Sequence, residues 1–247
     1  SGTANTELYN GTSWTEVNNL GTARHFFGGG GIYTSGIAAG GYTTGQVALS
    51  ESWNGTSWTE TSDLNNARST AAFGAVSNTA AVAFGGNPSG SPTNSAYTEN
   101  WNGSGWTEVS DLNTEGNGVT GIGSQTAALC VGGANRGAQT EQWNGSSWTE
   151  VNDMNTAAQS MASGGTTSDG FVSGGYSTTA DVKTESWNGS SWTEIVDMST
   201  GRYALKGSGT GGTNALAFGG VLLNESKSNA TESLDVPATS TRTFTVS

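Results

Sequence analysis

The sequence predicts an all-β fold in which one structural unit recurs along the whole chain of 247 residues. Two observations carry this prediction. The segment Thr184–Glu194 recurs almost unaltered around Trp53, Trp101 and Trp143, and an apolar run ending in Gly-Gly recurs between the copies. Gly, Ser, Thr and Asn dominate and no 3.6-residue periodicity appears, which argues against helices. Nine Trp at fixed positions in the repeat argue against disorder.

The spacing of the units predicts a β-propeller. The first aromatic positions of successive units are Tyr9, Trp53, Trp101, Trp143, Trp187 and, in degenerate form, Leu234. They lie 44, 48, 42, 44 and 47 residues apart. Periods of about 40–50 residues are typical of propeller blades or helical solenoids, and the composition excludes the helical alternative. We therefore expect one propeller domain over residues 1–247, closed by pairing of its N- and C-terminal strands.

Each unit reads as four short antiparallel strands. In the second unit these are Ser69–Val76, Ala80–Phe84, Ala96–Trp101 and Trp106–Val109. The second strand stops at Gly85-Gly86. Asn102-Gly103 predicts a hairpin turn between the last two strands, because both residues tolerate positive φ. Trp101 and Trp106 flank this turn and are expected to pair across the strands.

The count of strands predicts five blades. The first two strands of the unit occur five times. The last two occur six times, if the hairpin Thr6–Val17 and the C-terminal strands Ala230–Val236 and Thr241–Val246 are included. A ring of five fits this count when the N-terminal hairpin or part of the C-terminal segment completes the last blade. Six blades is the alternative, if an upstream segment supplies a sixth inner pair.

These motifs resemble the kelch repeat, in which an apolar strand ending in Gly-Gly precedes an aromatic residue, a turn, a Trp and a segment ending in Arg. Here the matching residues are Phe84-Gly85-Gly86, Trp101, Trp106 and Asn65-Asn66-Ala67-Arg68. The Arg recurs only as Arg24, Arg68 and Arg202, with Gly116 and Ala158 at the matching positions, and the turn is shorter than is usual in the family. The repeated Trp-Asn-Gly-Ser-Ser-Trp-Thr-Glu is also similar to arrays in uncharacterised marine phage structural proteins. The first resemblance implies a kelch-like propeller, and the second implies a tail or capsid protein.

Length variation is concentrated in one type of loop, between the second and third strands of each unit. The distance from Gly-Gly to the next aromatic varies from 10 to 15 residues, whereas the distance from an aromatic to the next Gly-Gly is 32 or 33. These loops share a face of a propeller with the links between blades, so this face is a candidate binding surface on a rigid ring. Its Thr, Ser, Asn and Gly suit a sugar more than an anion. The candidate ligand-binding residues are Tyr42, Asn87, Asn135, Arg136 and Tyr176 in the loops and Arg24, Arg68 and Arg202 in the links.

No catalytic motif, cofactor site or metal site is expected. His25 is the only histidine and is expected to pack beside Phe26-Phe27; Cys130 is the only cysteine and is expected to be buried. Glutamates recur two residues before the first Trp and two residues after the second. Their equivalence in every unit argues against a catalytic pair, and we expect solvated strand positions. The link aspartates Asp63, Asp111, Asp153 and Asp197 are expected to cap turns, and the link arginines to brace neighbouring blades.

Charge limits the partners. The net charge is -12 and only eight basic residues are present, which argues against nucleic acid and against anionic membranes. No apolar run reaches transmembrane length, so no membrane insertion is expected. We predict a non-enzymatic binding or structural module, extracellular or on a virion surface, that recognises a glycan or a surface protein and can belong to a larger assembly. One alternative is a glycan-active enzyme, with non-repeated acids at Glu115, Asp169, Asp181, Glu225 and Asp235. The other is a kelch-type protein-interaction adaptor.

Overall fold

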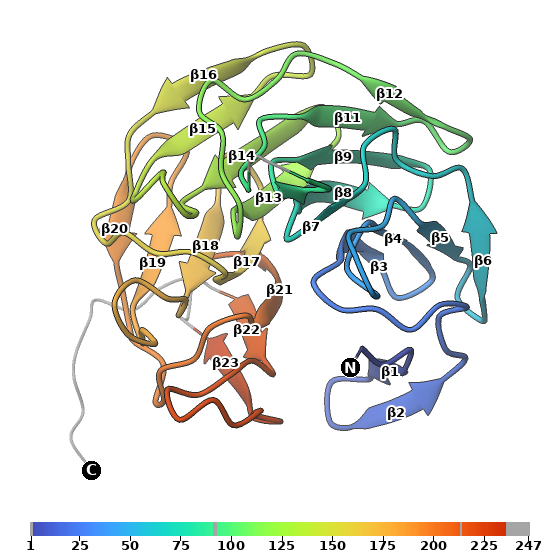
Figure 1. The fold of residues 1–247 in the computed structure, drawn as a ribbon. Coiled ribbons are helices and arrows are strands. Elements are labelled where there is room, and N and C mark those ends of the chain that lie inside the picture. The colour runs from blue at the N-terminus through green and yellow to red at the C-terminus, as the bar shows by residue number, and fades with distance from the viewer. Residues whose placement is uncertain (1, 91–92, 213, 236–247) are drawn as a thin grey trace.

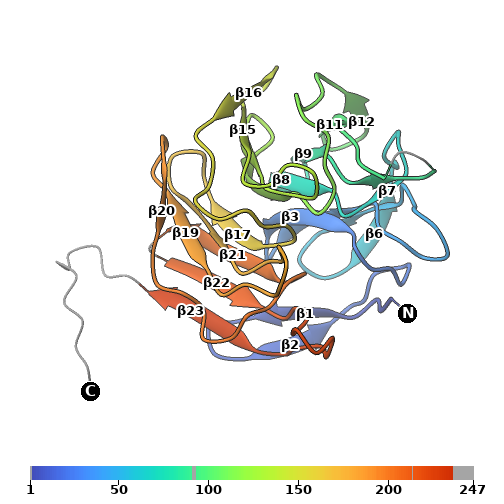
Figure 2. The ribbon, with the colours of Figure 1, turned by 60° about the vertical axis from the view of Figure 1, so that its left-hand side comes forward.

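The computed structural model describes residues 2–90, 93–212 and 214–235, and these form an all-β propeller (Figures 1 and 2). Five blades follow one another around a common centre, and no helix occurs in the described part of the chain. Within each blade the strands are antiparallel and run outward from the centre in chain order. The predicted fold class is therefore confirmed.

The strand bounds follow the repeat. The first blade holds β3 (Gly28–Ile32), β4 (Ser35–Ala39), β5 (Ser50–Trp53) and β6 (Trp58–Thr61). The second holds β8 (Ala72–Ser77), β9 (Ala80–Phe84), β11 (Thr98–Trp101) and β12 (Trp106–Glu108), with the short β7 (Arg68–Ser69) and β10 (Asn87–Pro88) paired beside them. The third holds β13 (Thr120–Ser124), β14 (Ala127–Val131), β15 (Thr140–Trp143) and β16 (Trp148–Val151). The fourth holds β17 (Ala162–Gly165), β18 (Gly170–Ser173), β19 (Thr184–Trp187) and β20 (Trp192–Glu194), and the fifth holds β21 (Lys206–Gly211), β22 (Asn214–Phe218) and β23 (Thr231–Asp235).

Two local features differ from the sequence-based expectation. The predicted first strand of the second unit is split into β7 and β8, because the backbone turns left-handed at Thr70 (φ 55°). In the hairpin turn only Gly103 has positive φ (93°). Asn102 instead accepts hydrogen bonds at Oδ1 from the backbone N–H of Ser104 and of Gly105, each at 3.0 Å. The turn lies where it was expected, but the Asn side chain stabilises it rather than an unusual Asn backbone.

Paired tryptophans fill the outer core of the blades. Trp101 and Trp106 lie directly opposite each other across β11 and β12, with ring centroids 5.3 Å apart. The Trp101 indole donates to the Asn78 carbonyl within its own blade (2.8 Å), while the Trp106 indole donates to Ser50 Oγ of the preceding blade (3.1 Å). One Trp therefore anchors the blade internally and the other joins it to its neighbour, as buried indoles need a hydrogen-bond partner.

Small residues are required where the blades converge. A Cβ added at Gly121 on β13 would overlap the backbone of Phe73 on β8 in the neighbouring blade. A Cβ at Gly207 on β21 would overlap the backbone of Ser163 on β17 in the same way. The Gly-rich first strands thus allow the close approach of neighbouring backbones at the centre of the ring.

Cys130 on β14 is fully buried, as expected, and burial raises the pKa of its thiol to about 12. The thiolate is the nucleophile in disulfide exchange. We therefore expect an aromatic disulfide reagent at pH 8 to leave the native thiol unmodified and to titrate one thiol per chain after denaturation in guanidinium. Rapid modification of the native protein would contradict this burial.

The N-terminal hairpin lies between the fifth blade and the first (Figure 1). Its strands, β1 (Thr6–Tyr9) and β2 (Trp14–Val17), form a separate two-stranded sheet, and β23 pairs only with β22 among the described strands. The expected strand Ala230–Val236 is observed as β23, whereas Thr241–Val246 lies outside the described residues. Pairing between the N- and C-terminal strands therefore stays a prediction.

Candidate functional site

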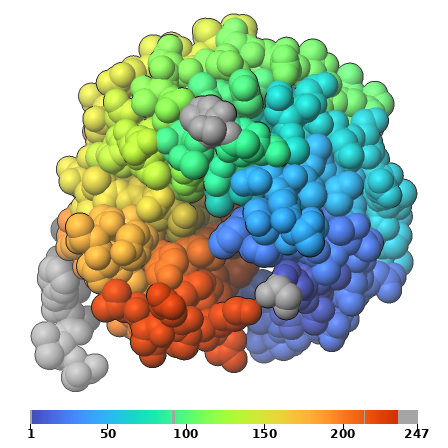
Figure 3. Space-filling model, viewed as in Figure 1, coloured from blue at the N-terminus to red at the C-terminus, as the bar shows by residue number. Residues whose placement is uncertain are grey.

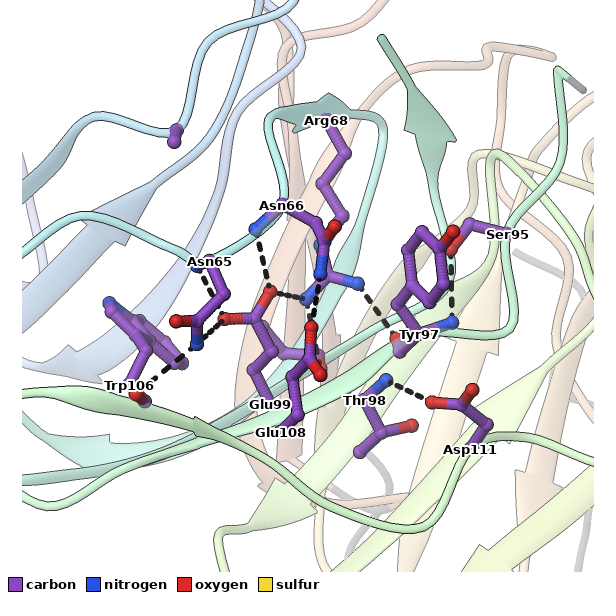
Figure 4. Close-up of polar contacts among 12 residues, drawn as sticks. Asn65, Asn66, Arg68, Ser95, Tyr97, Thr98, Glu99, Trp106, Glu108 and Asp111 are labelled. Carbon is purple, nitrogen blue, oxygen red and sulfur yellow. Dashed lines mark hydrogen bonds and ion pairs between the residues drawn. The ribbon is translucent and has the colours of Figure 1, made fainter. Parts of the chain in front are cut away.

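A buried ion pair holds the link between blades, and Figure 4 shows it for the second blade. The Arg68 and Glu99 side chains are both fully buried, with Arg68 Nη2 3.1 Å from Glu99 Oε1. Arg68 Nη1 donates to the Tyr97 carbonyl at 2.7 Å, and the Asn65 backbone N–H donates to Glu99 Oε2 at 2.7 Å. Burial lowers the pKa of the Arg68 guanidinium, and the nearby Glu99 carboxylate opposes this effect. The ion pair and these hydrogen bonds thus join the link to the third strand of the blade that follows it.

The same ion pair recurs in the first and fifth blades and corrects two expectations. Arg24 pairs with Glu51 at 2.5 Å and Arg202 pairs with Glu232 at 2.6 Å. The glutamate before the first Trp was expected to be solvated, yet Glu51, Glu99, Glu141 and Glu185 are buried. Each of these glutamates points to the same side of its strand as the buried Trp two residues later. The predicted binding residues Arg24, Arg68 and Arg202 are likewise buried, so their guanidinium groups face these carboxylates rather than the solvent.

In the third blade the arginine of the ion pair comes from a different segment of the chain. Gly116 occupies the position of the link arginine, and Arg136 from the variable loop fills the space instead: an added Cβ at Gly116 would collide with the Arg136 side chain. Arg136 Nη1 lies 2.7 Å from Glu141 Oε1 and also donates to the Thr114 carbonyl. Arg136 was expected to contact a ligand, but its side chain is buried and belongs to the scaffold.

In the fourth blade Ala158 replaces the arginine, and Glu185 accepts side-chain hydrogen bonds from Asn155 and from the Thr156 backbone but from no other described residue. In the fifth blade, partial burial opposes ionisation of Glu232. Hydrogen bonds from Ser199 and the Arg202 ion pair outweigh this and lower its pKa. The second glutamates of the repeat, such as Glu108, are exposed as expected.

The link aspartates have a related structural role. Asp63, Asp111 and Asp153 each accept a hydrogen bond from the first backbone N–H of the third strand, at Ser50, Thr98 and Thr140 respectively. These bonds span 13 residues of sequence. These three aspartates therefore join each link to the start of the third strand in the blade before it. They do not form the local Asx turns that were expected.

The loop face is organised by a repeated backbone arrangement. The residue after each link arginine position pairs with the residue after Gly-Gly, as in His25 with Tyr42 and Gln159 with Tyr176. The next residue is left-handed in all five blades: Phe26, Thr70, Gly118, Ser160 and Ala204 have φ of 54–61°. Backbone bonds join some of these across blades, such as Thr70 N–H to the Phe26 carbonyl at 2.7 Å. The rigid ring thus fixes the direction of side chains on this face.

Two aromatic clusters project from this arrangement. In the first blade His25 lies 4.7 Å from Phe26 and 5.4 Å from Tyr42 between ring centroids, and Phe26 is 55% exposed. The buried Nδ1 of His25 has no hydrogen-bond partner among the described residues. The second cluster joins two blades, since Tyr176 of the fourth packs edge-on against Tyr203 of the fifth at 5.2 Å. Both tyrosines are half-buried.

The remaining predicted residues are distributed over the loop face. Tyr42 and Tyr176 lie in the aromatic clusters, Asn135 is exposed with φ of 66°, and Asn87 pairs with Ser69 at the β10–β7 bridge. Sequence reasoning missed Phe26 and Tyr203 as members of this surface. A signal was available for Tyr203, because it follows Arg202 as His25 follows Arg24.

The non-repeated acids proposed for an enzyme are scattered. Asp169 lies in the turn between β17 and β18, at the opposite face, where it accepts a hydrogen bond from Gly212 N–H. Asp181 accepts bonds from the two backbone N–H groups that follow it, and Glu115 and Glu225 are exposed. The side chain of Asp235 lies outside the described set. No group of three His, Cys, Asp or Glu able to hold a metal occurs among the described residues.

The comparisons with known proteins address the fold. No protein-family model and no curated protein matches the chain. Among solved structures it is similar to one described as the structure of YjhT, with a TM-score of 0.77 over 93% of this chain and 87% of that chain. The sequence identity is 11%, so the likeness shows the propeller fold alone. In the described residues no helix is long and apolar enough to cross a membrane.

Proposed function

We propose that this protein is a non-enzymatic binding module that recognises a glycan through the loop face of the propeller. The observation that carries the proposal is the pair of aromatic clusters, His25–Phe26–Tyr42 and Tyr176–Tyr203, held on one face of a rigid ring. Aromatic faces offer flat apolar surface to the C–H side of a sugar ring, and tyrosine adds a polar tip. Tyrosine also contributes contact area at low cost in conformational entropy.

The loops around the clusters supply neutral hydrogen-bonding groups. The exposed Asn135 and the loop hydroxyls can satisfy sugar hydroxyls without a charged partner. The cationic candidates Arg24, Arg68, Arg136 and Arg202 are buried in ion pairs, which favours a neutral ligand over an anionic one. The net charge of -12 points the same way. We place the protein outside the cell or on a virion surface, and the kelch and phage resemblances belong to this proposal.

A glycan array tests the proposal with matched variants. Phe26→Gly removes the exposed ring of the first cluster and introduces the residue type that the third blade carries at this left-handed position. Tyr176→Ala with Tyr203→Ala removes the second cluster. Tyr33→Ala is the control, because Tyr33 is 73% exposed in the β3–β4 turn at the opposite face. We expect a roughly two- to tenfold loss of affinity for each cluster variant, since an aromatic contact contributes about 0.5–1.5 kcal/mol and about 1.4 kcal/mol corresponds to a factor of ten. The control should bind like the parent.

Two results would overturn the proposal. Failure of the parent protein to bind any glycan would leave a protein partner or a purely structural role. Equal loss in the Tyr33→Ala control would show that binding does not depend on the loop face. The unfolding temperature of each variant, measured alongside, separates lost recognition from lost folding.

A further inference from the structure

An opening separates the fifth blade from the first near the centre of the ring. Elsewhere each innermost strand packs against the next, β3 on β8, β8 on β13, β13 on β17 and β17 on β21. No comparable contact joins β21 to β3 in the described part of the structure. In the space-filling view the surface is hollowed between the orange-red last blade and the blue N-terminal part (Figure 3). As far as residues 2–235 are described, the ring is therefore incomplete at this sector.

The N-terminal hairpin meets the fifth blade as one blade meets the next. Trp14 on β2 packs against Phe218 at the end of β22, with ring centroids 5.2 Å apart. In the interior of the ring Trp148 packs against Phe84 in the same way, at 4.8 Å. Trp14 and Trp148 are both the second aromatic of their unit, and Phe218 and Phe84 both precede Gly-Gly. The hairpin thus follows the fifth blade in the regular order.

The hairpin meets the first blade regularly as well. The Trp58 indole donates to Thr6 Oγ1 at 3.0 Å, as the Trp106 indole donates to Ser50 Oγ at 3.1 Å. Because both flanking interfaces are those of the repeat, β1 and β2 occupy the outer half of a sixth sector. The inner half of that sector is the opening.

Strand residues that border the opening are exposed, whereas neighbouring blades cover such residues elsewhere in the ring. On β21, Lys206 and Ser208 are exposed, whereas the residues matching Lys206 in the other blades, Gly28, Ala72, Thr120 and Ala162, are small and buried. On β3, residues 29–31 are exposed glycines. Strand β1 pairs only with β2, so the edge that β5 or β11 uses to pair with its second strand is unpaired here among the described strands. The opening is therefore bordered by the exposed surfaces of β21 and β3 and by the unpaired edge of β1.

We propose that this opening binds a two-stranded β-hairpin of a partner polypeptide with the inner-strand pattern of the repeat: a strand of small residues, a turn, and an apolar strand ending in Gly-Gly. The apolar strand would pair with the free edge of β1, which is β-strand addition. The small-residue strand would lie between β3 and β21, where backbones must approach closely. The contacts of the N-terminal hairpin with the fifth blade and with the first blade both match those of the repeat. The space left in this sector therefore corresponds to one pair of inner strands.

Lys206 specifies one further property of the partner. In the first interface the residue facing Gly28 is Phe73 of the next blade. Gly28 corresponds to Lys206, so the partner residue at the position of Phe73 faces the Lys206 ammonium. Lys206 has no ion-pair partner among the described residues, and the surrounding protein lowers its pKa by desolvation although solvent reaches the side chain. A carboxylate at that position of the partner would compensate its charge.

A charge-exchange experiment tests the proposal with a defined probe. The probe is a cyclised peptide of residues 160–175, one inner pair of this chain, because an isolated hairpin is only marginally stable. Ser163 matches Phe73, so one peptide carries Ser163→Glu and the other Ser163→Lys. By calorimetry we expect the Glu peptide to bind the full chain roughly tenfold more tightly than the Lys peptide and to raise its unfolding temperature. Lys206→Glu should reverse this preference.

Two exposed positions supply matched controls. Ser208→Trp fills the opening and should abolish binding of both peptides, whereas Thr107→Trp on the outer strand β12 should leave it intact. Neither change meets the packed core, so the unfolding temperatures without peptide should stay close to that of the parent. Retained binding in Ser208→Trp, equal binding of both peptides to parent and Lys206→Glu, or no peptide binding would each overturn the proposal. None of these outcomes depends on glycan binding.

Discussion

Replacing Arg68 with methionine is expected to destabilise the propeller by about 3–5 kcal/mol, because it leaves the Glu99 carboxylate buried without a cation. Both side chains are inaccessible to solvent, and the guanidinium also holds the Tyr97 carbonyl at 2.7 Å. Methionine keeps much of the volume, so the effect isolates charge and hydrogen bonding from cavity formation. Urea unfolding followed by tryptophan fluorescence measures the loss.

Two comparisons make this prediction specific. Arg68→Met with Glu99→Met removes both charges, and it should recover a large part of the loss, since an apolar pair can replace a buried ion pair. Lys183→Met breaks an exposed ion pair with Glu194, at 2.6 Å, and should shift the urea midpoint far less. If Arg68→Met were as mild as Lys183→Met, the buried pair would not be a major support of the link.

The architecture could be predicted from sequence because it depends on periodicity. Trp101 and Trp106 flank a recognisable turn, as do the matching aromatics from Tyr9 to Trp192, and a Gly-Gly pair follows each second strand. These local signals repeat at a spacing that only a few architectures allow. The strand Ala80–Phe84 was predicted to the residue, since its composition and its stop signal agree.

The buried carboxylates were missed although strand alternation could have found them. Glu99 lies two residues before Trp101 on β11, so both side chains point to the same side of the sheet. A buried Trp therefore implies a buried Glu, which then requires a partner. The repeated Arg in the preceding link is the residue able to supply one. Reading charge as evidence of exposure was the error.

The loop face was harder to predict, because its geometry arises between segments far apart in sequence. The left-handed backbone of Phe26 has no sequence marker, since Thr70, Ser160 and Ala204 adopt the same conformation. The contact of Tyr176 with Tyr203 joins two blades, and depends on how the link enters the innermost strand. Tertiary pairing decides both features, and local composition does not encode it.

The variable loop of the third blade gives the other large expected effect. Arg136→Ala should destabilise the fold by about 3–5 kcal/mol, because Glu141 then stays buried without a cation. If these loops served recognition only, this residue would be dispensable for folding. Urea unfolding of Arg136→Ala therefore separates a scaffold role from a ligand-binding role for a residue in a variable segment.

The repeat also predicts how this loss can be repaired. Gly116 stands where Arg24, Arg68 and Arg202 stand in their links, so Gly116→Arg in the Arg136→Ala background should return a guanidinium to Glu141 and recover most of the stability. Gly116→Arg alone should destabilise, because the Arg136 side chain already fills the space. Lack of recovery in the double variant would mean that the link arginine and the loop arginine are not interchangeable. Recovery would show that the Glu141 carboxylate can be paired by an arginine from the preceding link as well as by one from the loop before the third strand.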